Sequence, residues 1–361
     1  MAQKKIHIIG SVGLPANYGG WETLAENLVG HLSNEFEFTV YCSLKRHIIK
    51  QLSYKGAKLV YLRLDANGLQ SIFYDLYSMV KSLRSSDIML VLGVSGCVFL
   101  PIIKLLYKGK IIVNIDGLEW KRDKWSKLTK MFLKLSECVA VKYADIIVTD
   151  NKAIQDYVLK QYNSTSVLIA YGGDHADTGF EREVNKNKPN SSLSFFKVCR
   201  IEPENNIQLI IEAFAGNSEN ELTIVGNWDN SEYGKALRLK YFAHKNIKLL
   251  NAIYDLRELN ELRCNTDIYL HGHSAGGTNP SLVEAMFLGL PIFAYDVSYN
   301  RETTLNSCQY FQTTKELEAL IKEAAVNRHL IVKNAENMKN IAMKLYTWKA
   351  IAEKYSDAFS A

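Results

Sequence analysis

Short apolar runs rich in β-branched residues alternate with longer amphipathic segments along the whole chain. Each run is bounded by glycine or by polar residues, as strands are, and the segments between them suit helices of roughly 10 to 15 residues. In the first half, the strand candidates are 5–10, 37–42, 58–62, 87–93, 110–116, 145–150 and 166–173. This alternation predicts βαβ units and a parallel sheet covered by helices on both faces.

The same alternation returns in the second half, after a polar stretch without periodicity. The strand candidates there are 194–200, 221–227, 246–251, 267–272 and 290–296. We therefore expect one doubly wound α/β domain over 1–172, a linker over 173–192 and a second such domain over 193–345. Open α/β sheets bind ligands beyond the carboxyl ends of their strands, so the two domains should face each other across a cleft at those ends.

The length of the chain agrees with two domains, because 361 residues exceed the roughly 250–300 that one hydrophobic core supports. Residues 346–361 form a further amphipathic pattern in which Tyr346, Trp348 and Tyr355 require cover. We expect a C-terminal helix that crosses back to pack over the domains. A cap on the second domain alone fits the same pattern.

Composition excludes several classes of protein. The hydrophobic content of 47% and the charged content of 22% are ordinary for globular proteins. A net charge of +5 favours anionic partners but falls short of a nucleic-acid binder. The six cysteines form no CxxC pair, which fits a reducing cytosol rather than a zinc site or a disulfide framework. The apolar run 88–103 is too short and too interrupted to span a bilayer, which takes about 20 residues.

Residues 271–291 change from a loop of glycines and small polar residues to an apolar helix with one acid, Glu284. Glycines allow backbone to approach a ligand closely, and Asn279 followed by Pro280 is a typical helix start. The loop amides and the helix N-terminus together predict a phosphate-binding site. Glu284 would repel a phosphate, but it would accept hydrogen bonds from the hydroxyls of an adjacent sugar. This combination indicates a nucleotide ligand.

Two other loops carry groups that suit an anion. Arg200 ends the strand candidate 194–200 and could bind a diphosphate through two hydrogen bonds, although an interdomain salt bridge would also explain it. Gly19 and Gly20 precede a helix start whose amides favour phosphate, although a tight turn without a ligand would use the same glycines. The GxGxxG fingerprint is absent from this first loop, which argues against a nicotinamide cofactor.

Asp116 ends a central strand candidate, and a basic segment with tryptophans follows it. A cleft acid belongs at such a strand end, although Asp116 could equally cap the strand. A basic helix with tryptophans suits an anionic membrane surface, whereas most such patterns are solvated faces over a core stripe. The residues predicted to meet a membrane or a membrane-borne acceptor are Glu119, Trp120, Lys121, Lys124, Trp125 and Lys127.

Two motifs are missing from the sequence. It contains no D-x-D, the acid pair with which many sugar transferases chelate a metal, and no G-x-x-x-x-G-K-[ST] phosphate loop. We therefore expect no metal and no cofactor. An anionic leaving group would have to be stabilised by arginine and by helix N-termini.

The stretch "HSAGGTNPSLVEAMFLGLP" and the two-domain plan resemble the large family of retaining GT-B glycosyltransferases that use nucleotide sugars. Three further stretches, "IIGSVGLPANYGGWETLAENLV", "NIDGLEWKRDKWS" and "RIEPENN", resemble a narrower branch. This branch is the bacterial β-1,4-rhamnosyltransferases of capsule and cell-wall polysaccharide assembly. The resemblance covers nearly the whole chain and implies a GT-B fold with the donor in the second domain.

The resemblance also implies substrates and site residues. It implies dTDP-rhamnose as donor, a diphospho-undecaprenyl sugar as acceptor, and a cytoplasmic protein peripheral to the inner membrane. It implies that Asp116 orients the acceptor or acts as base, that Arg200 stabilises the departing diphosphate, and that Glu284 binds the ribose. The residues implied in donor binding are Gly19, Gly20, Arg200, Asn205, Gly276, Gly277, Thr278, Asn279, Ser281 and Glu284.

The chain departs from the wide family at two positions. Gly276 replaces the first of two glutamates eight residues apart, and Asn205 replaces a lysine five residues after the arginine. One acid fewer at the sugar fits a deoxysugar with fewer hydroxyls. A UDP-hexose donor, a sugar-nucleotide epimerase and a non-catalytic nucleotide-sugar-binding subunit are the alternatives. The acceptor sugar, the linkage and the oligomeric state are not determined by the sequence.

Overall fold

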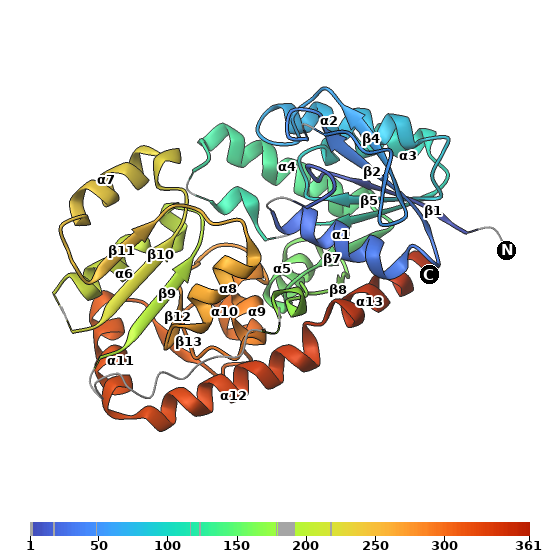
Figure 1. Cartoon of the computed structure of the whole chain (residues 1–361). Helices are drawn as coiled ribbons and strands as arrows, with labels where there is room; N and C mark the ends of the chain where they lie inside the picture. Colours follow the sequence, from blue (N-terminus) through green and yellow to red (C-terminus); the bar gives the residue numbers. More distant parts are fainter. Residues whose placement is uncertain are drawn as a thin grey trace. The chain divides into compact units, whose positions relative to one another are not determined.

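The computed structural model describes residues 3–16, 19–47, 49–115, 117–122, 124–177, 179, 192–216 and 219–361. They divide into two compact units (Figure 1). Unit 1 consists of 1–121, 125–171 and 348–361, and unit 2 consists of 122–124 and 172–347. Each unit is a parallel sheet with covering helices, so the predicted pair of doubly wound α/β domains is confirmed.

Unit 1 is built on an eight-stranded sheet of order β3-β4-β2-β1-β5-β6-β7-β8, in which only the β3–β4 pair is antiparallel. Its strands are β1 (Lys5–Ile9), β2 (Glu37–Ser43), β3 (Ser53–Tyr54), β4 (Ala57–Leu62), β5 (Ile88–Leu92), β6 (Lys110–Asn114), β7 (Ile146–Thr149) and β8 (Val167–Leu168). Every residue of β5 is buried, because a central parallel strand is covered on both faces.

The helices of unit 1 lie on both faces of this sheet. They are α1 (Gly20–Leu32), α2 (Gln70–Ser82), α3 (Leu100–Leu106), α4 (Lys127–Tyr143), α5 (Lys152–Tyr162) and α13 (Trp348–Ser360), with short 3₁₀ turns η1 (Cys97–Phe99) and η2 (Glu119–Lys121). Figure 1 shows α2, α3 and α4 on one face and α1 and α13 on the other. This division follows from right-handed crossovers, because the chain runs toward β3 after α1 and toward β8 after α2, α3 and α4.

The C-terminal helix α13 belongs to unit 1. Phe359 packs edge-on against the rings of Phe36 and Phe38, with ring centroids 5.4 and 6.4 Å apart. The hydroxyl of Tyr355 accepts a hydrogen bond of 2.8 Å from the Asn114 side chain on β6. The chain therefore returns to its first unit after completing the second.

Unit 2 is built on a six-stranded, wholly parallel sheet of order β11-β10-β9-β12-β13-β14. Its strands are β9 (Ser194–Val198), β10 (Glu221–Val225), β11 (Ile247–Leu250), β12 (Ile268–His271), β13 (Ile292–Tyr295) and β14 (Gln309–Phe311). Its helices are α6 (Ile207–Ala215), α7 (Glu232–Tyr241), α8 (Leu256–Cys264), α9 (Pro280–Phe287), α10 (Ser298–Thr303), α11 (Thr314–Val326) and α12 (Arg328–Leu345), with 3₁₀ turns η3 (Asp174–Ala176), η4 (Pro203–Asn205) and η5 (Trp228–Asn230).

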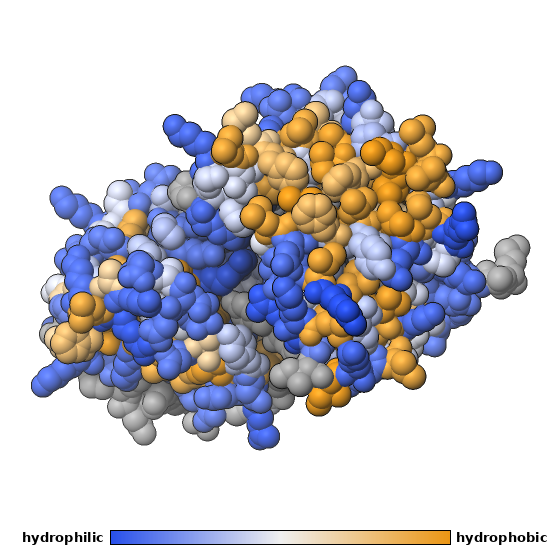
Figure 2. All heavy atoms as spheres, turned by 90° about the horizontal axis from the view of Figure 1, so that it is seen from above, coloured by the Kyte–Doolittle hydropathy of each residue, from blue (hydrophilic) through white to orange (hydrophobic). Residues whose placement is uncertain are grey.

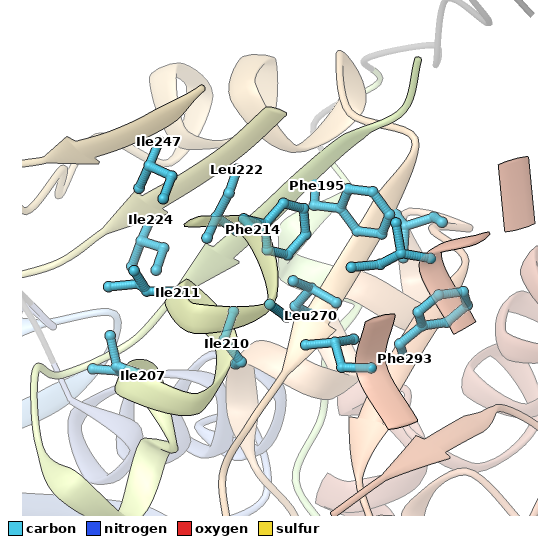
Figure 3. Close-up of a cluster of buried hydrophobic side chains, with 14 of the residues drawn as sticks. Phe195, Ile207, Ile210, Ile211, Phe214, Leu222, Ile224, Ile247, Leu270 and Phe293 are labelled. Carbon is cyan, nitrogen blue, oxygen red and sulfur yellow. The ribbon is translucent and has the colours of Figure 1, made fainter. Parts of the chain in front are cut away.

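One hydrophobic core joins the sheet of unit 2 to α6. Figure 3 shows Phe195 on β9, Leu222 on β10 and Phe293 on β13 beside Ile210 and Phe214 of α6. All five of these side chains are buried, and the Phe195 and Phe214 rings meet edge to face at 5.0 Å. This core fixes β9 and β12, whose carboxyl ends carry the loops considered below.

Three further features bear on function. All six cysteines are free, and Cys138 on α4 is the exposed one. No helix among the described residues is long and apolar enough to cross a membrane. The short strands β3 and β14 fall outside the predicted runs.

Candidate functional site

The glycine-rich loop after β12 leads into helix α9, as predicted. Asn279 is the N-cap, and its side chain accepts a hydrogen bond of 3.1 Å from the Ser281 amide. Pro280 occupies the first turn, where its missing N–H costs nothing. The Ser281 hydroxyl donates to Asn279 at 2.8 Å and lies 3.0 Å from the hydroxyl of Tyr269 on β12. Strand and helix are thus held together at the start of the helix.

Glycine is required at position 276. Gly276 has a φ of 128°, a conformation that other residues rarely adopt. A Cβ at this position would lie 3.0 Å from Nε2 of His273. The position at which the wide family carries a glutamate therefore lies against a histidine ring in this chain. Gly277 and Thr278 follow as buried residues of the same loop.

The loop after β9 is hydrogen-bonded to this glycine-rich loop. Asn205 donates to the Arg200 carbonyl at 2.9 Å, and its side-chain oxygen lies 3.0 Å from Nδ1 of His273. The backbone amide and the hydroxyl of Ser274 both donate to the Glu204 carbonyl at 2.9 Å. Asn205, which replaces the lysine of the wide family, thus fixes the positions of the arginine loop and the glycine-rich loop relative to each other.

Positive charge gathers around these two loops. Burial, followed by the charges of Arg122, Lys197 and Arg200, lowers the pKa of His273 well below its usual value. Lys197 lies on β9 with 1% of its surface exposed, and burial lowers its pKa also. Two acids, Glu202 and Glu204, lie among these cations. Glu202 pairs with Lys124 at 3.7 Å, and burial raises the pKa of the Glu204 carboxyl. The arrangement suits an anion that would complete the charge balance.

Glu284 is engaged within the protein. Its carboxylate forms an ion pair with the buried Arg263 of α8 and lies 3.3 Å from Nε2 of His175. Burial alone would raise the pKa of this carboxyl, but Arg263 and His175 together lower it to about 2. Glu284 is therefore ionised at neutral pH, with each oxygen already accepting one contact. A carboxylate offers about four lone-pair sites, so two acceptor positions are left for ligand hydroxyls.

In unit 1, the loop before α1 folds back on an acid of that helix. Gly19 is the N-cap with a φ of 141°, and any Cβ there would collide with the Glu22 carboxylate. Glu22 is buried and accepts a hydrogen bond of 2.6 Å from the Val12 amide. This carboxylate competes with an external anion for the positive end of α1, where Gly20 is the first helical residue. Asp116 lies outside the described residues.

The predicted acceptor or membrane segment does not form one outward face. The Trp120 indole donates to Glu137 at 3.0 Å, and the Trp125 indole donates to Glu119 at 3.1 Å. The ammonium of Lys121 lies 5.6 Å from the centre of the Trp120 ring. In unit 2, Lys124 pairs with Glu202 as described above. Lys127 begins α4 and is exposed.

Glu137 is the centre of a polar cluster in unit 1. Its carboxylate accepts hydrogen bonds from the hydroxyls of Tyr157 at 2.7 Å and Tyr162 at 2.6 Å, in addition to the bond from Trp120. The Lys134 ammonium lies within 4.9 Å of the centres of all three rings. These contacts join the middle of α4 to Trp120 of η2 and to Tyr157 and Tyr162 of α5.

Several residues of the site are not identifiable from sequence motifs. Lys197 is a lysine inside an apolar strand run, which is an unusual position and a usable signal. Arg122 belongs to unit 2 despite its place in the basic segment, and no local pattern indicates this. Arg263 and His175 meet Glu284 from elements 21 and 109 positions away in the sequence. Among the described residues, no group of three or more His, Cys, Asp or Glu could hold a metal ion.

Two family models divide the sequence between them. Residues 3–174 match a "Domain of unknown function (DUF1972)", and residues 180–343 match "Glycosyl transferases group 1". The second match falls within unit 2, and the first falls almost wholly within unit 1. A comparison with curated proteins finds no match.

Solved structures of similar fold cover almost the whole chain. Sucrose-phosphate synthase from Thermosynechococcus elongatus has a TM-score of 0.81 at 14% identity, over 99% of this chain and 98% of its own. HepE from Anabaena, in complex with UDP-glucose, has a TM-score of 0.74 at 14% identity, over 99% and 100%. The catalytic domain of starch synthase IV from Arabidopsis thaliana, bound to ADP and acarbose, has a TM-score of 0.73 at 11% identity, over 100% and 99%. The fold is therefore the GT-B fold, as predicted.

Proposed function

We propose that this glycosyltransferase moves L-rhamnose from dTDP-rhamnose onto a lipid-diphosphate-linked sugar in bacterial surface polysaccharide assembly. It would act at the cytoplasmic face of the membrane, without a metal and with retention of configuration. The observation that carries the nucleotide-sugar part is the group of cations around the glycine-rich loop of unit 2. The charges of Arg122, Lys197 and Arg200 all lower the pKa of His273, which lies in the loop that leads into helix α9.

A nucleotide diphosphate suits this group in two ways. Its negative charge would balance the cations, of which Arg122 and Lys197 are buried and Arg200 is exposed, and backbone amides of the glycine-rich loop before α9 would supply hydrogen bonds. The ribose hydroxyls would donate to the two remaining acceptor positions of Glu284. Among the similar structures, HepE is in complex with UDP-glucose and starch synthase IV with ADP, which supports a nucleotide in this chain also.

The choice of a deoxysugar rests on the resemblance to the rhamnosyltransferases and on the surroundings of Gly276. A glutamate at that position would meet the His273 ring, so the site lacks one carboxylate that could bind sugar hydroxyls. Rhamnose has no hydroxyl at its sixth carbon and requires one acceptor fewer. Unpaired polar groups in a site discriminate strongly between substrates that differ by one hydroxyl.

Departure of the diphosphate is the step that the cations would promote. Negative charge develops on the leaving phosphate oxygen as the bond to the sugar breaks, and preorganised donors stabilise that charge. The acceptor hydroxyl would attack from the same face, and the leaving phosphate would take its proton. No side chain of the protein is then required as nucleophile.

A donor panel tests this proposal. Purified protein would receive diphospholipid-linked glucose or N-acetylglucosamine with dTDP-rhamnose, UDP-glucose, UDP-galactose or UDP-N-acetylglucosamine, each alone. We expect transfer from dTDP-rhamnose only. Transfer from a UDP-sugar would contradict the rhamnose assignment, and conversion of the donor without acceptor would indicate an epimerase. Nucleotide binding without any transfer would favour a binding subunit.

Replacement of Arg200 measures the role of the cations. Arg200→Ala should cost about 2.7–4 kcal/mol of transition-state stabilisation, as loss of other preorganised anion donors does. The readout is kcat with dTDP-rhamnose at saturating donor. Arg238→Ala is the matched control, because Arg238 lies in the same unit and pairs with Asp229 on the surface. Equal kcat values for the two variants would remove Arg200 from the site.

A further inference from the structure

One face of unit 1 exposes apolar side chains on three helices. On α4, Leu128, Met131 and Leu135 recur at helical spacing and point outward, with Leu128 78% exposed. On α3, Ile102 and Leu105 are exposed, the latter to 85%. Figure 2 shows apolar side chains gathered over the face of unit 1 that carries these helices. Single exposed leucines are ordinary on a soluble protein, but a contiguous patch is a mark of a binding surface.

Helix α2 continues the same patch. Leu69 precedes it, and Phe73, Tyr77 and Val80 follow at spacings of three and four residues, all exposed. Because α2, α3 and α4 lie on one face of the sheet, their outward stripes form one surface (Figure 1). We call this surface the apolar face.

Hydrogen bonds hold the three helices in place beneath the apolar face. The buried Asp75 of α2 accepts a hydrogen bond of 3.0 Å from the amide of Gly96, just before η1 and α3. The buried Ser136 of α4 donates to the Val94 carbonyl in the same loop. The inner sides of α2 and α4 therefore hold the loop between β5 and α3 in place. The exposed apolar residues take no part in these hydrogen bonds.

The charges on these helices are of one sign. Their only two acids, Asp75 and Glu137, are buried at 2% exposure each, whereas Lys81, Lys127 and Lys142 are exposed. Helices elsewhere in unit 1 differ in this respect. Exposed acids occur on α5 at Asp156 and on α13 at Glu353. Asp145, which follows α4, is ion-paired with Lys104 of α3. Helices that expose apolar residues and lysines but no carboxylate of their own are complementary to anionic lipid.

We infer that the apolar face of α2, α3 and α4 seats unit 1 on an anionic lipid surface. This differs from the membrane contact expected from sequence, because it rests on exposed apolar residues of α2, α3 and α4 rather than on Trp120 and Trp125, whose indoles bond to Glu137 and Glu119. The biological reason rests on the proposed function, since a lipid-linked acceptor is met at a bilayer. The physical claim does not depend on it.

Vesicle binding tests the inference without donor or acceptor. The full chain would be sedimented with vesicles of phosphatidylglycerol and phosphatidylcholine, and with phosphatidylcholine alone. We expect binding to the anionic vesicles and a loss of about tenfold or more in the triple variant Leu128→Ser, Met131→Ser, Leu135→Ser, since each buried CH₂ contributes about 0.8 kcal/mol. The matched control is Leu239→Ser with Phe242→Ser, which removes two equally exposed apolar side chains from unit 2.

A second variant tests the inference if the triple variant fails to fold. Lys81→Glu with Lys142→Glu should weaken binding to anionic vesicles and leave the apolar residues intact. Unchanged binding of both variants, or no binding by the wild type, would overturn the inference. Concentration-dependent self-association that the triple variant abolishes, without vesicle binding, would assign the face to a second copy instead. A protein that binds vesicles but transfers no sugar to a soluble acceptor would contradict only the proposed function.

Discussion

Each unit buries a carboxyl group on a helix behind a strand-end loop. The two carboxyl groups differ in ionisation at neutral pH: Glu284 of unit 2 is charged, and Asp75 of unit 1 is mostly neutral. In unit 2, Arg263 and His175 outweigh burial and hold the pKa of Glu284 at about 2. In unit 1, Asp75 has a backbone amide of Gly96 as its partner, and burial raises its pKa to about 8. One oxygen of Asp75 has no hydrogen-bond partner. Burial favours the neutral acid, and only a nearby cation reverses that preference.

The difference in ionisation follows the different roles of the two acids, one beside a predicted ligand site and one within the framework of the fold. Glu284 is kept as an anion next to a loop built for a ligand, at the cost of burying an arginine beside it. Asp75 serves to fix the loop before α3, and a neutral carboxyl is sufficient for that. In this protein the buried acid beside the ligand loop keeps its charge, and the buried acid that only fixes a loop does not.

Removal of the cation beside Glu284 should break the contrast most strongly. Arg263→Met leaves a buried carboxylate without its main partner, which costs about 3–5 kcal/mol when one member of a buried pair is deleted. The pKa of Glu284 should then rise toward that of Asp75. The measurement is the free energy of unfolding in urea at pH 7. Arg257→Met, an exposed position on the same helix α8, is the control and should change little.

Acid should remove the stabilising charge of Glu284 without any mutation. Its pKa is lowered from 4.5 to about 2, so its contribution is present above pH 4.5 and is lost as the pH falls toward 2. The expected loss is on the order of 3 kcal/mol, because one pKa unit corresponds to 1.36 kcal/mol. Unfolding in urea would be followed from pH 6 to pH 2 for the wild type and for Glu284→Gln. A slope that is equal in both proteins would contradict the assignment.

Glu284→Gln should also weaken nucleotide binding. The amide offers fewer acceptor sites than the carboxylate and places a donor beside Arg263. Titration calorimetry with dTDP would measure the change. An unchanged affinity would remove the ribose from Glu284 and leave it as a structural ion pair.

Asp75→Asn should act with the opposite sign. With its pKa raised from 3.8 to about 8, this carboxyl makes the protein less stable as the pH rises between those values. An amide keeps the acceptor for Gly96 and removes the ionisation. Because it also buries an unpaired N–H, which costs about 1–3 kcal/mol, the net gain in stability at pH 8 should be smaller than removal of the ionisation alone would give. Asp156→Asn on the exposed side of α5 is the control.

The sequence predicts the fold better than the partners of each site residue. Alternating apolar runs locate twelve of the fourteen strands found in the described part of the chain, because a parallel strand must be apolar on both faces. The two short strands are missed for lack of such a run. One of them, β3, is an edge hairpin whose turn at Lys55 and Gly56 has positive φ values of 48° and 90°.

In the site also, features set by neighbouring residues in the sequence are predictable, and contacts between distant residues are not. The Asn279 cap and Pro280 follow from residue type and spacing alone. The Arg263 and His175 partners of Glu284 come from separate elements, and only the folded chain brings them together. Trp120 and Trp125 were predicted to meet a membrane or a membrane-borne acceptor. Their indoles bond to Glu137 and Glu119, and the sequence pattern does not indicate these partners.

The outward stripe of α4 ends in a thiol. Cys138 follows Leu135 by three residues and is exposed, whereas Cys42, Cys97, Cys264 and Cys308 are buried and Cys199 is partly so. A maleimide dye would therefore label the unmodified protein selectively on this helix. Its emission colour would report the polarity around α4 directly, and quenchers placed at known depths in the lipid chains would give the distance to which the helix penetrates.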